Sequence, residues 1–450
     1  MKGVLFSTLI FLLAFNVQSQ DIIEKLYDYS EQEYVRDIVK CDDGGYFILG
    51  ASYMGNWRAI FLKIDNNGDV LFYKMLTQFY PSKMIKNNNG YYAVGYIANP
   101  SNGFPIGQLV CLNESGNVLW TKEYPYTYYS YLTDIVRLDS GDLLIIKELS
   151  LTEQDYELMR SDSLGNNKWI KDTYGNNDII INTNNEIVLT GNEFQDLPEP
   201  QFDDTNWPTL EKFDFEGTKI LKADYPYMNW GSSISSGYDG NNYYMATDNH
   251  DYELCKLDNN GDTIWTRNYD NNYSIHSFCN VDGDLMLATG SFGSKLFILS
   301  FSTNGDSLNL FVKDNYQKQS GTKLFIDNDS VVLIGNVGYD NSSKVDMCFL
   351  KMPLNYLITG IKEKTSNDNF SLSLFPNPFS TQFTLENLPE NKQMELVLMN
   401  TFGQIAYRKA LLGGQPQQRI TFNQALASGL YILKIYSDKK LLFTQKVVKQ

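Results

Sequence analysis

The sequence is poor in the residues that most often carry catalytic or metal chemistry. Its 450 residues include only two histidines, His250 and His276. His276 lies in the apolar-leaning stretch SIHSFC, where we expect a core residue, and His250 lies in the loop-like stretch DNHDYE, which makes it the better site candidate. No G-x-S-x-G turn accompanies them to present a nucleophile. We therefore expect no histidine-rich metal site and assign no catalytic residue.

Cysteine is also scarce, with five residues at Cys41, Cys111, Cys255, Cys279 and Cys348. The odd number excludes complete intramolecular pairing, and no C-x-x-C spacing indicates a metal or redox site. Most of these cysteines are expected to be small core residues on strands. A single disulfide remains an alternative.

Positive charge is in deficit, because 37 Lys and Arg residues face 53 Asp and Glu residues, for a net charge of −16. A nucleic-acid-binding surface is basic, so we expect no nucleic-acid partner. The same charge disfavours simple adhesion to anionic membranes. It permits cation binding, although most acidic surfaces are only solvated.

Long apolar runs are missing except at the N-terminus. Lys2 precedes the apolar run Val4–Phe15, and Val17-Gln18-Ser19 suits cleavage before Gln20 or Asp21, so residues 1–20 are expected to be a signal peptide. The run is too short to span a membrane comfortably, and no other transmembrane segment is expected. No lipid-attachment cysteine follows the leader. We expect an exported chain that is soluble or anchored by another device.

One repeated passage dominates the rest of the sequence. In Leu254–Tyr269, LCKLDNNGDTIWTRNY, two strands are predicted around a tight turn in which Asp258 bonds the backbone and Gly261 takes a positive φ. Related turns have glycines at Gly68, Gly116, Gly165, Gly217 and Gly305, at intervals of 44 to 52 residues. That period suits a four-stranded antiparallel unit and matches propeller arrays.

The count of half-repeats predicts the number of blades. An upstream half such as DDGGYFILG (Asp42–Gly50) occurs seven times, but only six downstream halves are complete. The seventh begins at Cys348 and breaks off at Pro353, and Ile22–Tyr29 resembles the missing outer strand. We therefore predict an all-β chain with a seven-bladed β-propeller over 21–358, closed by its N-terminal strand, because closure removes exposed strand edges. Eight blades is the alternative.

A different β unit follows a polar linker at 359–369. Four blocks mark it: LFPNPF at 374–379, VLMNTFGQ at 397–404, ASGLYIL at 427–433 and KVVK at 446–449. In order and spacing, residues 370–450 closely resemble the C-terminal sorting domain of the type IX secretion system of Bacteroidota. The residues that carry the motif are Pro376, Asn377, Pro378, Gly403, Gly429, Tyr431, Lys446 and Lys449.

The resemblance implies a fold, an address and partners. It implies a small Ig-like β-sandwich read by an outer-membrane translocon and removed by a cell-surface sortase-like protease. It also implies attachment to an anionic lipopolysaccharide, or release. The expected location is therefore the outer-membrane cell surface or the medium. A plain Ig-like adhesion module is the alternative.

Two features of the propeller repeat suggest chemistry and are better explained by structure. The stretch beginning at Asp65 resembles the start of an EF-hand but lacks the Glu at its twelfth position, so we favour a hairpin turn and expect no metal.

The D-x-x-G-x-x-x-W pattern at Asp258–Trp265 resembles the tryptophan-docking motif of quinoprotein propellers, in which the Trp packs between blades. Trp120 and Trp169 hold the same place. Quinone dehydrogenases use adjacent cysteines, which are lacking here, so no cofactor is expected. WD-type repeats fit less well.

Loop variation indicates which face binds. With strands A to D numbered from the centre, the tight A–B and C–D turns share one face, and the variable B–C loops and aromatic-rich D–A connections share the other. Variable loops on a rigid scaffold commonly carry binding sites. The candidates on this face are Trp57, Tyr128, Tyr129, Trp207, Trp230, His250 and Tyr252. The alternative is that such aromatics pack between blades.

Three hypotheses of function remain open. The first is a secreted or surface propeller that binds a glycan or a protein, since Tyr and Trp combine a flat apolar face with a polar edge. The second is a glycan hydrolase using carboxylates such as Asp203 or Asp204. The third is a structural surface module without a small ligand. The sequence favours binding over catalysis.

Overall fold

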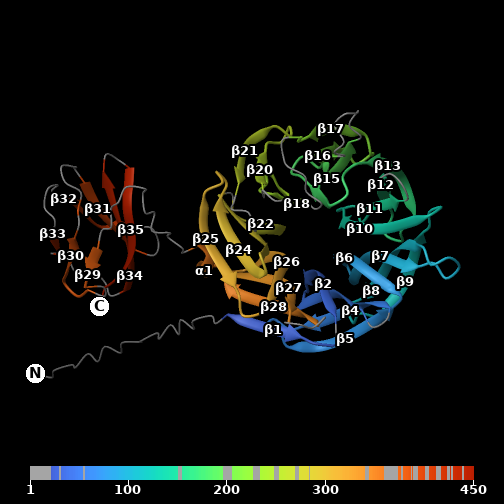
Figure 1. Cartoon of the computed structure of the whole chain (residues 1–450), viewed down its shortest axis with the longest axis horizontal. Helices are drawn as coiled ribbons and strands as arrows, with labels where there is room; N and C mark the ends of the chain where they lie inside the picture. Colours follow the sequence, from blue (N-terminus) through green and yellow to red (C-terminus); the bar gives the residue numbers. More distant parts are fainter. Residues whose placement is uncertain are drawn as a thin grey trace, which may run out of the picture. The chain divides into compact units, whose positions relative to one another are not determined.

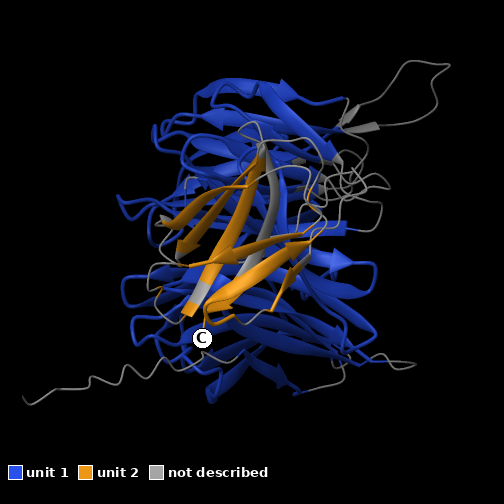
Figure 2. Ribbon diagram, turned by 90° about the vertical axis from the view of Figure 1, so that its left-hand side faces the viewer, with its two compact units in different colours: residues 1–357 blue, residues 358–450 orange. Residues whose placement is uncertain are grey.

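The computed structural model describes residues 22–29, 32–53, 56–150, 155–195, 205–226, 234–247, 253–268, 273–282, 284–339, 344–358, 373–376, 379–386, 388, 394–400, 405–411, 417–422, 426, 429–437 and 440–449. The expected signal peptide, 1–20, lies outside them. The chain divides into two compact units, residues 1–357 and 358–450, coloured separately in Figure 2. None of the described helices is long and apolar enough to cross a membrane.

Unit 1 contains seven four-stranded antiparallel sheets, which Figure 1 shows arranged in a ring. The predicted seven-bladed propeller is thereby confirmed. Blade 1 is β2 (Glu33–Lys40), β3 (Tyr46–Tyr53), β4 (Trp57–Ile64) and β5 (Val70–Thr77). Blade 2 is β6 (Phe79–Asn87), β7 (Gly90–Ala98), β8 (Pro105–Asn113) and β9 (Val118–Tyr124). Blade 3 is β10 (Tyr129–Arg137), β11 (Leu143–Ser150), β12 (Asp155–Ser161) and β13 (Asn167–Thr173).

The remaining blades repeat this meander. Blade 4 is β14 (Asp178–Ile181), β15 (Ile187–Gln195), β16 (Thr205–Phe213) and β17 (Lys219–Asp224). Blade 5 is β18 (Ile234–Tyr238), β19 (Tyr243–Thr247), β20 (Glu253–Leu257) and β21 (Thr263–Asn268). Blade 6 is β22 (Tyr273–Asp282), β23 (Leu285–Phe292), β24 (Lys295–Ser302) and β25 (Ser307–Lys313). Blade 7 is β26 (Lys318–Asp327), β27 (Ser330–Gly338), β28 (Val345–Pro353) and β1 (Ile23–Tyr27).

The propeller is closed by its first strand. β1 pairs antiparallel with β28, in register Ile23↔Lys351 to Tyr27↔Met347, so the outer strand of blade 7 comes from the N-terminal end. The Tyr27 hydroxyl donates a hydrogen bond to the Gly68 carbonyl of blade 1 at 2.8 Å. The sheet and this bond join blades 7 and 1.

The repeated turns form as the sequence predicts. All six turn glycines have positive φ, between 70° and 82°. In blade 1, Asp65 Oδ1 accepts the backbone N–H groups of Asn67 and Asp69, both at 2.8 Å. The hairpin-turn interpretation of the EF-hand-like stretch is confirmed, because this carboxylate caps its own turn.

Tryptophans join neighbouring blades through those turns. The Trp169 indole N–H on β13 donates to the Phe215 carbonyl in the C–D turn of blade 4 at 3.1 Å. Trp265 on β21 makes the same bond to the Thr303 carbonyl of blade 6, also at 3.1 Å. The docking role that the quinoprotein resemblance implies is confirmed at both positions. Trp120 also packs on the core cluster that blades 2 and 3 share, with its ring 6.0 Å from that of Tyr92.

Two tyrosines of the D–A connections have the same role. The Tyr124 hydroxyl donates to the Gly165 carbonyl, and the Tyr225 hydroxyl to the Gly261 carbonyl, each at 2.8 Å. Both side chains are buried. For these two aromatics, packing between blades is the correct interpretation, and they are not available to a ligand.

The Tyr124→Phe variant is expected to lose about 1 kcal/mol of unfolding free energy, because the Gly165 carbonyl then lacks its buried donor. Urea unfolding monitored by tryptophan fluorescence measures the loss. Tyr128→Phe is the control, since Tyr128 is 48% exposed. Equal stability of the two variants would contradict the role given to the Tyr124 hydroxyl.

Unit 2 consists of two sheets. One is β29 (Ser373–Phe375), β30 (Gln382–Glu386) and β33 (Gln417–Thr421); the other is, in order, β32 (Ile405–Leu411), β31 (Met394–Asn400), β34 (Gly429–Ser437) and β35 (Lys440–Lys449). Phe379 and Phe383 are fully buried in the core together with Leu396, Leu398 and Leu433. This arrangement is consistent with the predicted Ig-like sandwich. The short α1 (Asn355–Ile358) precedes the unit.

The sorting-motif residues are only partly described. Pro376 follows β29 and is exposed, Gly429 begins β34, and Tyr431 is buried. Lys446 and Lys449 lie in β35. Asn377, Pro378 and Gly403 lie outside the described residues. The five cysteines are free thiols, and all but Cys279 are buried, so core packing is their main role.

Candidate binding site

The inner strands of the propeller carry β-bulges near their N-terminal ends. The pairing registers pass over one residue in each of five inner strands: Arg36, Ser82, Thr133, His276 and Thr322. A bulge re-aims side chains and is common beside functional sites. The bulges place polar groups around the centre of the propeller.

Glycines on the second strand of the blade make room for these bulges. A Cβ at Gly95 would lie 2.0 Å from the Tyr80 carbonyl oxygen, and one at Gly290 would lie 1.7 Å from that of Ser274. Only glycine fits so close to backbone. These glycines end the upstream half-repeats, so they are the sequence signal from which the bulges could have been predicted.

One polar residue from each blade follows the bulge or its equivalent and forms what we call the polar ring: Asp37, Lys83, Asp134, Asp178, Ser235, Ser277 and Lys323. Where an acid occupies the position, it accepts a backbone N–H from the inner strand of the next blade. Asp37 accepts that of Met84 at 2.9 Å, and Asp134 accepts that of Ile179 at 2.8 Å. The ring thus links blades at the centre as the tryptophans do at the outside.

The lysines of the polar ring neutralise its buried acids. Lys83 lies 3.2 Å from Asp134 and 3.7 Å from Asp178, and Lys323 pairs with Asp37. Burial lowers the pKa of Lys83, but Asp134, Asp178 and Asp37 outweigh burial and raise that pKa above its ordinary value. Lys83 therefore remains charged, and Asp37 and Asp134 are occupied by structural partners.

A pocket of about 340 Å³ opens at the polar ring. Its lining comes from the inner strands and from the residue before β14: Arg36, Asp37, Lys83, Asn177, Asp178, Ser235, Ser236, His276, Ser277, Thr322 and Lys323. Its size lies in the lower part of the roughly 300–1,000 Å³ range of small-molecule sites. Every lining side chain is polar, which suits a hydroxylated or charged ligand.

Arg36 lies partly buried in this pocket and has no carboxylate partner among the described residues. Its guanidinium lies 4.7 Å over the Tyr80 ring, and its Nη2 donates to the Tyr80 hydroxyl. Its Nε is buried and has no hydrogen-bond partner within the described structure. Burial holds the pKa of Arg36 below its ordinary value, against the smaller opposite effects of Tyr96 and Tyr34. A guanidinium nevertheless remains charged in a protein.

A row of four aromatic side chains, one of which is the Tyr80 that contacts Arg36, crosses blades 1 to 3. We call it the aromatic path: the Trp57 ring lies 4.7 Å from Tyr80, Tyr80 lies 4.9 Å from Tyr96, and Tyr96 lies 4.8 Å from Tyr131. All four are half-buried, and the exposed Tyr53 ring lies 5.1 Å from Trp57. Tyr80 and Tyr131 lie near the starts of A strands, Tyr96 near the end of a B strand, and Trp57 at the start of a C strand. All four therefore lie on the face that carries the B–C loops and the D–A connections.

The candidates predicted from sequence are placed as follows. Trp57 begins β4 and belongs to the aromatic path. Tyr129 begins β10, and its ring lies 4.8 Å from that of Phe104 in a B–C loop, while Tyr128 is exposed beside it. Trp207 lies on β16 opposite Glu193. Trp230, His250 and Tyr252 lie outside the described residues.

Sequence reasoning missed most residues of the path and misjudged one residue of the pocket. Tyr80, Tyr96 and Tyr131 were not candidates, since nothing in the sequence shows that they meet. His276, expected in the core, is exposed at a bulge and lines the pocket, because the extra residue turns it out of the alternating pattern. Its Nδ1 lies 2.8 Å from the Gly321 carbonyl, which can only accept, so Nδ1 carries the proton.

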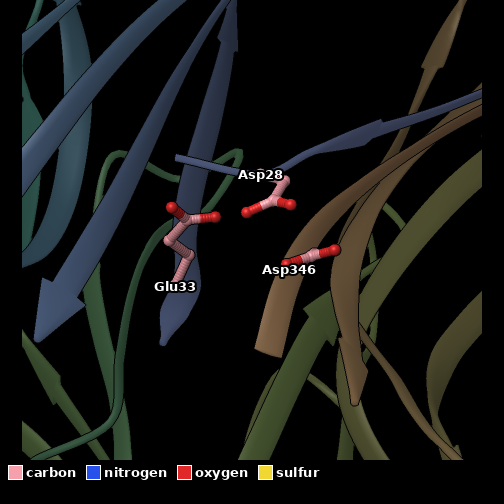
Figure 3. Close-up of side chains that lie close together, drawn as sticks. All are labelled: Asp28, Glu33 and Asp346. Atoms are coloured by element: carbon pink, nitrogen blue, oxygen red, sulfur yellow. The ribbon is translucent and has the colours of Figure 1, made fainter. Parts of the chain in front are cut away.

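A separate acidic cluster lies where β1, β2 and β28 meet. Oxygens of Asp28, Glu33 and Asp346 lie within 4.8 Å of one another (Figure 3). Such carboxylates could ligate a cation, but Lys344 Nζ lies among them, 2.5 Å from Asp28 and 3.9 Å from Asp346. The Tyr339 hydroxyl also donates to Asp346 at 2.7 Å. These contacts describe an ion-paired seam of the closing blade.

Comparison with known families concerns unit 2. Residues 373–450 match the family described as secretion system C-terminal sorting domain. The C-terminal unit is a type IX sorting domain. A sorting domain of this kind marks the chain as exported cargo delivered to the cell surface or the medium. The motif residues Gly429, Tyr431 and Lys449 lie within the matched range.

Comparison with solved structures concerns the propeller that the sorting domain accompanies. The structure of U3-55K matches 73% of this chain and 98% of its own with a TM-score of 0.50 and 11% identity. The β-propeller domain of the Trilobed protease from Pyrococcus furiosus matches 72% of this chain and 97% of its own, with a TM-score of 0.47 and 9% identity. At 11% identity the match to U3-55K shows the fold alone. No curated protein matches the sequence.

Proposed function

We propose that this type IX cargo is a surface or secreted glycan-binding protein whose ligand lies along the aromatic path. The observation that carries the proposal is the unbroken contact from Trp57 through Tyr80 and Tyr96 to Tyr131, on the face with the variable loops. Aromatic faces stack on the apolar faces of sugar rings, and the tyrosine hydroxyls add polar contacts. A row of rings suits a chain of sugars better than a single one.

We also propose how the sorting domain is handled. An outer-membrane translocon reads it, and a sortase-like protease removes it at the cell surface. The remaining propeller is then joined to lipopolysaccharide or released. The separate cores of the two units support this scheme, because removing one does not expose the interior of the other.

Binding is favoured over hydrolysis by the state of the carboxylates. A glycan hydrolase needs two carboxyl groups with different tasks. Burial raises the pKa of Glu148, which lies opposite Tyr131 on β11 and could serve as an acid. Asp37 and Asp134 are occupied by backbone N–H groups and lysines. The proposed alternatives Asp203 and Asp204 lie outside the described residues.

A glycan array tests the proposal with the full chain and its Trp57→Ala/Tyr96→Ala variant. We expect a defined glycan class to bind the unaltered chain and the variant to bind it about tenfold or more weakly, because two stacking faces are lost. Tyr356→Ala is the control, since Tyr356 is 49% exposed and lies in α1, away from the path. A blank array would overturn the proposal in favour of a protein ligand, and shortened glycans would show hydrolysis.

A further inference from the structure

The pocket at the polar ring has more unused donors than acceptors. Arg36 Nε and Asn177 Nδ2 are both buried and lack hydrogen-bond partners among the described residues. An unpaired buried donor is costly, and a ligand acceptor would relieve that cost. Asp37, by contrast, already accepts the N–H groups of Ile38 and Met84 and a bond from Lys323.

Ion pairing also singles out Arg36. Lys83 pairs with Asp134 and Asp178, and Lys323 pairs with Asp37. The Arg36 guanidinium forms no ion pair with the described residues. This occurs in a chain whose net charge is −16, so acids are abundant elsewhere. A partly buried guanidinium with an open donor is suited to bind a carboxylate through parallel N–H···O bonds.

Arg36 also connects the pocket to the aromatic path. Its guanidinium lies against Tyr80, the second ring of the path, and it lines the pocket as well. A sugar chain whose end stacks on Tyr80 therefore has that end beside Arg36. The pocket volume of about 340 Å³ admits one sugar residue rather than a chain.

We propose that the central pocket binds the carboxylate of an acidic sugar at the end of the glycan, with Arg36 and Asn177 as its donors. The proposal rests on the proposed glycan function and specifies its ligand class. Asp178, which accepts the Ser236 N–H at 3.1 Å and hydroxyl at 3.0 Å, lies at the same pocket and can accept a sugar hydroxyl. Arg36 and Asn177 are specificity residues in this proposal, because each brings a buried donor without a partner in the described structure to the pocket.

Calorimetric titration of the full chain with glucuronate, glucose and acetate tests the pocket directly. We expect glucuronate to bind roughly tenfold or more tightly than glucose, the size expected for hydrogen bonds to a charged group. Arg36→Gln and Asn177→Ala should each remove that preference. The matched control is Arg408→Gln in the sorting domain, whose side chain is 55% exposed. Two variants are used because Arg36 also packs on Tyr80, so thermal unfolding of each must match the unaltered chain.

The outcomes separate this inference from the function on which it rests. Equal binding of glucuronate and glucose would overturn the acidic-sugar site, whatever the array shows. Acetate binding as tightly as glucuronate would also overturn it, in favour of a free carboxylate. If the array shows glycans whose binding survives chemical reduction of their carboxyl groups, the glycan function stands and the acidic end is wrong. If no glycan on the array binds but glucuronate does, the proposed acidic-sugar pocket stands and the proposed longer glycan is wrong.

Discussion

A chain that lacks Phe370–Gln450 is expected to stay in the periplasm instead of reaching the cell surface or the medium. The reason is that residues 373–450 match the sorting domain, and this unit has its own core. Surface protease treatment and cell fractionation, in a host with type IX machinery, measure the distribution. The truncated propeller should remain folded, since the seven blades bond to one another and to β1 without unit 2.

Two controls distinguish a lost address from a lost fold. The purified truncation should show the same thermal transition as the propeller in the full chain. In the reciprocal experiment, residues 359–450 are joined to a periplasmic reporter that carries residues 1–21 of this chain, and the fusion should move to the surface. Normal surface delivery of the truncated propeller would overturn the sorting assignment, and so would a reporter that stays in the periplasm.

The architecture could be predicted from sequence because local signals recur. Each C–D turn needs a glycine with positive φ and a side chain that caps the turn, and these requirements appear as a visible period around Gly68 and Gly261. The number of blades followed from counting half-repeats. Ile22–Tyr29 was expected to complete the seventh blade because it resembles the missing outer strand, and β1 occupies that position.

The candidate site could not be predicted in the same way, since it is made from contacts between blades. Arg36 meets Tyr80, and Tyr96 meets Tyr131, from different blades. A repeat in the sequence does not indicate which aromatic rings of neighbouring blades come into contact. Even the face was only inferred from loop variation, and Trp57 is the one predicted residue that the structure places in the path.

The β-bulges are a second reason why the site could not be predicted from the sequence. An alternating pattern predicts that His276 points into the core, but one extra residue in the strand reverses that direction. The glycine at the end of the facing strand, Gly290, was visible in the sequence and was assigned only to a turn-and-strand pattern. Its close approach to the Ser274 carbonyl is a property of the folded backbone.

Removal of β1 is expected to abolish cooperative folding of the propeller. Tyr27 is 5% exposed and hydrogen-bonds Gly68, and its burial and bond stabilise the closed blade by about 2–4 kcal/mol. Glu24 Oε2 lies 2.6 Å from Lys313 Nζ, with side chains 30% and 5% exposed, and leaving the buried Lys313 ammonium without this partner costs about 1–3 kcal/mol. Together these losses are comparable with the roughly 5–15 kcal/mol that holds a typical protein folded.

The experiment compares a chain that begins at Ile22 with one that begins at Ser30. The first should unfold in a single transition on heating, and the second should show none or should aggregate, because the edge of β28 is left unpaired. Glu24→Gln and Tyr27→Phe divide the effect, and Asp69→Asn is the control, since it removes only the exposed partner of Lys25 and should cost less than about 1 kcal/mol. If the chain beginning at Ser30 melts like the longer one, closure by β1 contributes little, and contacts of the inner strands such as the Lys323–Asp37 pair of the polar ring must hold the seventh blade.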